Sequence, residues 1–104
     1  MAFNPDKAEV EPLRRRLHDE HGLTHLRVRQ RGKVLTLESG PVDAAHRHAR
    51  FRRDTVHLWT LEMPGRGSRW QKTLFRDTLD TLTDLLVKDF PRMVGPIEPI
   101  QDQT

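Results

Sequence analysis

The sequence contains no cysteine, which excludes a disulfide framework, a thiolate zinc site and a cysteine nucleophile. Long apolar runs are also missing: stretches such as Leu85–Val87 fall far below the roughly 20 residues that cross a bilayer. The first residues lack a basic segment followed by an apolar one, so no secretory signal is predicted. We therefore expect a soluble protein in the cytoplasm.

Metal-binding motifs are absent as well. His18 and His21 lie three residues apart, with His25 just beyond, whereas the helical pair of metalloproteases is four apart with a glutamate after the first histidine. No glycine-rich phosphate loop of the Walker or Rossmann type occurs. We predict neither a metal nor a cofactor.

Catalytic signatures are equally sparse. Ser39 and Ser68 stand in glycine-containing loops, but neither lies in a strand-turn-helix elbow that would expose a nucleophile. No catalytic residue is therefore predicted. A small ribonuclease-like site built from His46, His48, His57 and nearby arginines leaves no spacing signature, so it stays open as a third reading of the function.

Positive charge is concentrated in the first half of the chain. From Arg14 to Arg53 there are eleven Arg or Lys against four acidic residues, whereas from Arg76 onward three bases face six acids. Fourteen of the eighteen bases are arginine, whose planar guanidinium suits contacts to phosphate or carboxylate. The folded protein is expected to be electrically polar.

Two helices are predicted at the ends of the chain. Asn4-Pro5-Asp6 is a helix start, Pro12 either kinks that helix or restarts it, and Gly22 ends it. Near the other end, Phe75, Leu79, Leu82, Leu86 and Phe90 recur at helical spacing, with Asp77 or Thr78 as cap and Pro91 as stop. The second helix has the broader apolar stripe, so it is expected to seal the core.

Alternation between apolar and polar residues predicts strands between these helices. The first two strands begin at Leu26 and end at Glu38, on either side of a turn at Arg31-Gly32-Lys33, and the others are 49–53, 55–63 and a fifth at 69–73. Short turns between consecutive strands favour an antiparallel meander. The predicted fold is α+β: a four- to five-stranded antiparallel meander with an N-terminal and a C-terminal helix, in the order α-β-β-β-β-(β)-α. One domain, 1–94, precedes a proline-rich tail, 95–104.

The same alternation sorts side chains onto two faces. The helix-facing set is expected to be Leu26, Val28, Leu35, Leu37, Phe51, Trp59 and Trp70. The opposite face then carries five arginines, Arg27, Arg29, Arg31, Arg50 and Arg52, which are the predicted nucleic-acid or anion-binding residues.

Three functions follow from this pattern. The first is a small basic, non-catalytic binding or accessory domain whose arginine-rich sheet face contacts DNA or RNA. The second is a protein-protein interaction subunit, either a homodimer or the partner of an acidic protein, joined through a sheet edge or a second apolar face at Val56 and Leu58. The third is the ribonuclease-like enzyme. No membrane partner is expected.

Overall fold

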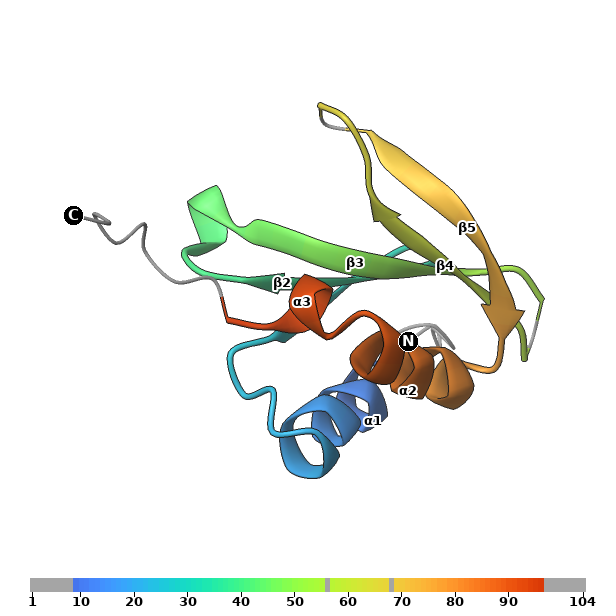
Figure 1. The fold of residues 1–104 in the computed structure, drawn as a ribbon, viewed down its shortest axis with the longest axis horizontal. Helices are drawn as coiled ribbons and strands as arrows, with labels where there is room; N and C mark the ends of the chain where they lie inside the picture. The colour runs from blue at the N-terminus through green and yellow to red at the C-terminus, as the bar shows by residue number, and fades with distance from the viewer. Residues whose placement is uncertain (1–8, 56, 68, 97–104) are drawn as a thin grey trace, which may run out of the picture.

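A computed structural model describes residues 9–55, 57–67 and 69–96, which form an antiparallel sheet with helices on one side (Figure 1). Its five strands pair in chain order. They are β1 (Arg27–Arg31), β2 (Val34–Ser39), β3 (His46–Arg53), β4 (Trp59–Pro64) and β5 (Trp70–Asp77). The helical elements are α1 (Val10–Arg15), η2 (Arg16–Glu20), η3 (Val42–Ala44), α2 (Leu79–Asp89) and α3 (Pro91–Val94). The predicted α+β meander between two helices is confirmed.

The first helix tolerates its proline because of where the helix begins. Pro12 stands in the first turn of α1, where a backbone N–H has no intrahelical acceptor. The chain continues without interruption into η2, a π-helical turn. Gly22 then takes a φ of 70°, and the N–H of Leu23 donates to the carbonyl of Leu17 at 2.9 Å. The predicted glycine stop is confirmed, whereas the start at Asn4 lies outside the described residues.

The core lies between the sheet and the helices. Leucines dominate it, around the rings of Phe51 and Trp59, and α2 contributes three leucines from one face. The buried set is Leu13, Leu17, Leu26, Leu35, Leu37, Ala49, Phe51, Trp59, Leu61, Leu79, Leu82, Leu86 and Val94. Thr78 caps α2 by accepting a hydrogen bond from the N–H of Thr81. No helix in the described part of the chain is long and apolar enough to cross a membrane.

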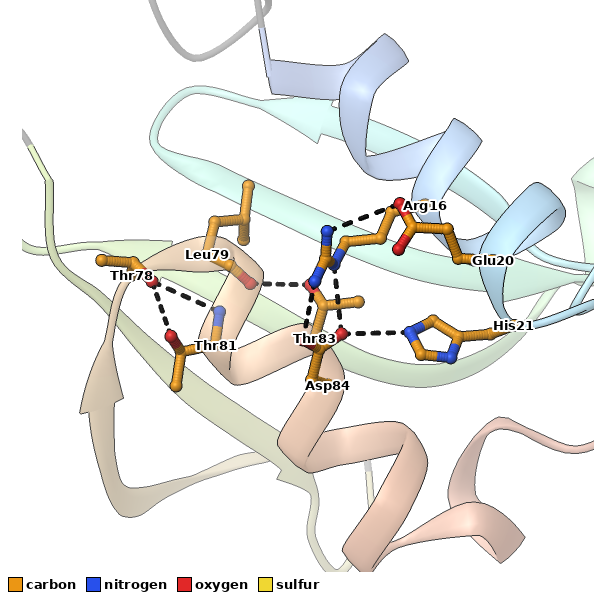
Figure 2. Close-up of polar contacts among 8 residues, drawn as sticks. All are labelled: Arg16, Glu20, His21, Thr78, Leu79, Thr81, Thr83 and Asp84. Carbon is orange, nitrogen blue, oxygen red and sulfur yellow. Dashed lines mark hydrogen bonds and ion pairs between the residues drawn. The ribbon is translucent and has the colours of Figure 1, made fainter.

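An ion-pair network joins η2 to α2 (Figure 2). Arg16 binds Asp84 through two nitrogens, at 3.1 and 2.6 Å, and His21 Nε2 lies 3.1 Å from the same carboxylate. The hydrogen bond from Arg16, more than any other contact, lowers the pKa of Asp84 below its ordinary value. The N-terminal helix, whose apolar face is narrow, is thus fixed to the helix that seals the core.

Two strand boundaries differ from the prediction. β3 begins at His46, three residues earlier than expected, and β4 begins at Trp59 rather than near Thr55. Leu58 lies in the connection before β4, where its carbonyl accepts from the N–H groups of Asp54 and Thr55. Leu58 therefore does not give β4 a second apolar face, and Val56 lies outside the described residues.

β5 differs most from the prediction. Trp70 was expected to face the helices, but it pairs with Pro64 and lies on the opposite face of the sheet, against Arg50. The strand also extends to Asp77, so Phe75 belongs to β5 and not to the helix, although its ring still packs on Phe90. A register shift between β4 and β5 leaves Leu74 almost fully exposed.

Candidate nucleic-acid interface

Charged side chains cross the open face of the sheet in three rows. Residues paired across antiparallel strands point to the same face, so the register defines each row. The first row is Arg27, Glu38 and Arg47; the second is Arg29, Thr36, Arg50, Glu62 and Lys72; the third is Arg31, Val34, Arg52, Thr60 and Arg76. All five arginines of the predicted site lie in these rows, on the face turned away from the helices.

Two buried glutamates divide four of these five arginines into pairs. Glu62 accepts a hydrogen bond from Nε of Arg50 and another, at 3.3 Å, from Nε of Arg52. Glu38 lies between Arg27 and Arg29, at 3.7 and 3.9 Å. The guanidinium groups are therefore less repulsive than five isolated charges would be. Sequence alternation already places Glu38 and Glu62 on this face, but which arginines they contact depends on the strand register, which the sequence did not give.

Other cations on the face have no carboxylate partner. Within the described part of the chain, Arg31, Arg47 and Lys72 make neither an ion pair nor a side-chain hydrogen bond. Arg76, at the end of the third row, is paired with Asp54. Eight cations thus share the three rows with two carboxylates, and the three unpaired ones are spread over β1, β3 and β5.

Trp70 adds an aromatic surface to this basic face. The guanidinium of Arg50 lies 4.5 Å from the centroid of its ring, a cation-π contact. The ring is half-buried, so part of it stays accessible. Figure 1 shows the hairpin end of β4 and β5 rising away from the helices. Trp70 is the first residue of β5, at that end of the hairpin.

Two adjoining hollows lie beside Trp70. One, of about 160 Å³, is lined by Arg29, Arg31, Val34, Thr36, Glu38, Arg47, Arg50 and Trp70. The other, of about 280 Å³, is lined by Ala45, His46, Arg47, Pro64, Gly67, Arg69 and Trp70. Because Arg47 and Trp70 border both hollows, they form one trough across the face. Arg29, Arg31 and Arg50 of the predicted set line it, whereas Arg27 and Arg52 lie outside it.

Arg47 was missed because β3 contains an irregularity. Leu37 pairs with Ala49, yet the next residue of β2 pairs with Arg47, so His48 is the extra residue of a bulge. His48 and Ala49 are both buried, and Arg47 is turned to the open face although it lies an odd number of residues from Arg50. Strict alternation from Arg50 and Arg52 places position 47 on the other face, and no local residue type signals the bulge.

The histidines lie at several separate positions in the fold. His48 is buried, with Nε2 at 2.7 Å from the Ser39 hydroxyl and Nδ1 at 2.8 Å from the Met93 carbonyl. His46 contacts that ring edge-on, whereas His57 lies in the turn at the opposite end of β3, so the three histidines of the ribonuclease-like reading do not converge. No group of three metal-ligating side chains occurs among the described residues.

Ser39 and His48 have the spacing of a nucleophile and its base, but both are buried beneath α3. Because the Met93 carbonyl can only accept, Nδ1 of His48 carries the proton and Nε2 accepts from Ser39. Burial, more than any other influence, lowers the pKa of His48. The pair binds α3 to the sheet and presents no open position to a substrate.

No family model, no curated protein and no solved structure matches this chain.

Proposed function

We propose that this chain is a non-catalytic binding domain that holds single-stranded nucleic acid in the trough of its open sheet face. The observation that carries the proposal is the meeting of unpaired cations with an accessible indole ring. Arg31 and Arg47 line the same trough as Trp70 and have no carboxylate partner among the described residues.

The cations favour a polyanion over water. Neutralising phosphates with arginine releases condensed counterions, and this release supplies much of the affinity of nucleic-acid-binding proteins. Arg31 and Arg47 can bind phosphate without breaking an existing ion pair. Arg50 and Arg52, which bind Glu62, are better suited to holding the shape of the face.

Trp70 favours a single strand over a duplex and over an acidic protein. Unpaired bases stack on aromatic side chains for about 1–3 kcal/mol each, whatever the sequence. In a duplex the bases are already stacked and only phosphates and groove edges are offered. A strand along the trough can place phosphates on the arginines and a base on Trp70 at the same time.

Fluorescence anisotropy of a labelled oligouridine, titrated at several salt concentrations, tests the proposal. Affinity should fall linearly with the logarithm of salt, and Arg31→Ala or Arg47→Ala should each reduce the slope by about 0.7, the value for one phosphate contact on a single strand. Arg15→Ala is the matched control, because Arg15 is exposed on α1 on the far side of the sheet. Absence of binding to single-stranded RNA and DNA at low salt would overturn the proposal.

A further inference from the structure

Glu38 is an unusual carboxylate within the open face. Its side chain is only 5% exposed and its Oε2 is buried, yet this oxygen accepts no hydrogen bond within the described part of the chain. The nearest nitrogens, from Arg27 and Arg29, lie 3.7 and 3.9 Å from its oxygens, beyond hydrogen-bond range. Buried acceptors in folded proteins are nearly always hydrogen-bonded. Glu62, by contrast, accepts from two guanidinium groups.

The same glutamate forms part of the wall of the smaller hollow, whose volume is about 160 Å³. A cavity of about 150 Å³ is known to hold one benzene ring, so this hollow has room for the six-membered ring of a base, and the second ring of a purine would extend into the adjoining hollow of about 280 Å³. Trp70 supplies a surface for stacking, and Glu38 supplies acceptors for N–H groups. Arg31 and Arg47 supply free donors at the rim.

We propose that this hollow binds one guanine base of the strand, with Glu38 as the residue that selects it; this inference rests on the proposed function. Guanine presents two parallel donors, N1–H and the N2 amine, which match the two oxygens of a carboxylate. Pairing with both oxygens requires the Glu38 side chain to turn its buried Oε2 toward the hollow. Its O6 and N7 are acceptors that a guanidinium binds as a pair. The base therefore complements both the carboxylate and the arginines of the hollow.

The other bases fit Glu38 less well. Uracil has a single N–H between two carbonyl oxygens, both of which face the carboxylate unfavourably. Adenine and cytosine place an acceptor nitrogen beside the amine, so one oxygen of Glu38 stays unpaired. A buried acceptor left without a donor loses about 1–3 kcal/mol, which is the source of the selectivity.

The wild-type protein alone provides the first test. Anisotropy titrations compare an oligouridine with the same strand carrying one central guanosine, adenosine, cytidine or inosine. We expect the guanosine strand to bind roughly tenfold more tightly than oligouridine, the usual effect of one well-matched base contact. Inosine retains N1–H, O6 and N7 but lacks the amine, so it should bind with intermediate affinity.

Glu38→Gln and its control Glu62→Gln provide the second test. Each removes one negative charge from the face, so each should strengthen binding to oligouridine, but only Glu38→Gln should also lose the contact to guanine. Only Glu38→Gln should bring the ratio between guanosine and uridine strands close to one, whereas Glu62→Gln should keep it near tenfold. Circular dichroism checks that both variants fold.

The outcomes separate the two proposals. Binding of every strand with equal affinity by the wild-type protein overturns the guanine site and leaves the nucleic-acid function standing. A guanosine preference that persists in Glu38→Gln also overturns the assignment to Glu38. If no strand binds at low salt, both proposals are wrong. Because the inosine comparison needs no variant, the test survives a failure of Glu38→Gln to fold.

Discussion

Trp70 is held on the open face by two neighbours of different kinds. On one side the guanidinium of Arg50 lies over its ring, and Arg50 is itself fixed by Glu62. On the other side its strand partner is Pro64, at the end of the hairpin. A tryptophan fixed in this way loses little conformational freedom when a base stacks on it, which favours a role in binding over a role in the core.

Replacing Trp70 should therefore affect binding more than folding. Trp70→Ala is expected to weaken oligouridine binding by about 1–3 kcal/mol, the usual contribution of a stacked base, while Trp70→Phe should retain most of it. The melting temperature should fall only a few degrees, because the ring is half-buried. Anisotropy and thermal unfolding measure the two effects.

Trp59, the second tryptophan, serves as the contrast: it is buried at 2% exposure, so Trp59→Ala should unfold or strongly destabilise the protein. Equal binding by wild type and Trp70→Ala would remove the indole from the proposed interface. Loss of the fold in Trp70→Ala would show that the ring belongs to the core after all.

At this scale the sequence predicted the arginines well and the tryptophan badly. Arg27, Arg29 and Arg31 alternate with a clear apolar set, so their face could be read directly. Trp70 was assigned to the core because large apolar rings are usually buried and its strand shows no clear alternation. Its face follows from the register of β4 and β5, in which Trp70 pairs with Pro64 and Lys72 with Glu62, and no local pattern indicates that register.

At the scale of elements, α3 depends on its neighbours. A helix of four residues is not stable alone. It is retained by burial of Val94 and by two histidines: His48 reaches the Met93 carbonyl and His25 Nε2 lies 2.7 Å from the Val94 carbonyl. The sequence did not predict this helix, because Pro91 was interpreted only as the end of the preceding helix. It did not predict the bulge in β3 that buries His48 either.

This anchoring makes stability depend on pH. Burial, the neighbouring His46 and His25 together keep the pKa of His48 below its ordinary value of 6.5, although the bond to Met93 partly opposes them. As pH falls, His48 therefore takes up a proton in the unfolded chain before it does so in the folded protein. Its contribution to the free energy of unfolding is present above about pH 6.5 and is lost as pH falls below that value. The melting temperature should drop between pH 7 and pH 5.

His48→Asn retains a donor for Met93 but cannot become charged. It should cost about 1–3 kcal/mol at neutral pH, through lost packing, and show a flatter dependence of melting temperature on pH. His57→Asn, at an exposed position in the turn before β4, is the control and should keep the wild-type dependence. An unchanged pH dependence in His48→Asn would mean that another group is responsible.

Across the whole molecule, charge is separated between the two layers. The three rows of the open face hold eight cations and two carboxylates, whereas α1, η2, α2 and α3 carry six acidic and five basic side chains. The predicted electrical polarity is thus directed across the sheet, from the helices to the trough. The helical layer is close to neutral, so the like charges of the open face repel one another without being balanced from the other side of the sheet.

Moderate salt should therefore stabilise the free protein while it weakens nucleic-acid binding. Like charges on neighbouring strands destabilise a sheet, and at about 0.1 M salt their interaction is screened beyond about 10 Å. We expect the melting temperature to rise by a few degrees between very low salt and about 0.3 M sodium chloride. The double variant Arg31→Ala, Arg47→Ala should be more stable at low salt and nearly insensitive to added salt, because it lacks the two uncompensated guanidinium groups.

Arg14→Ala is the opposite control, since Arg14 binds Glu11 on α1 and its loss removes an attraction. A wild-type melting temperature that falls as salt is added would show that ion pairs such as Arg16–Asp84 outweigh the repulsion on the open face.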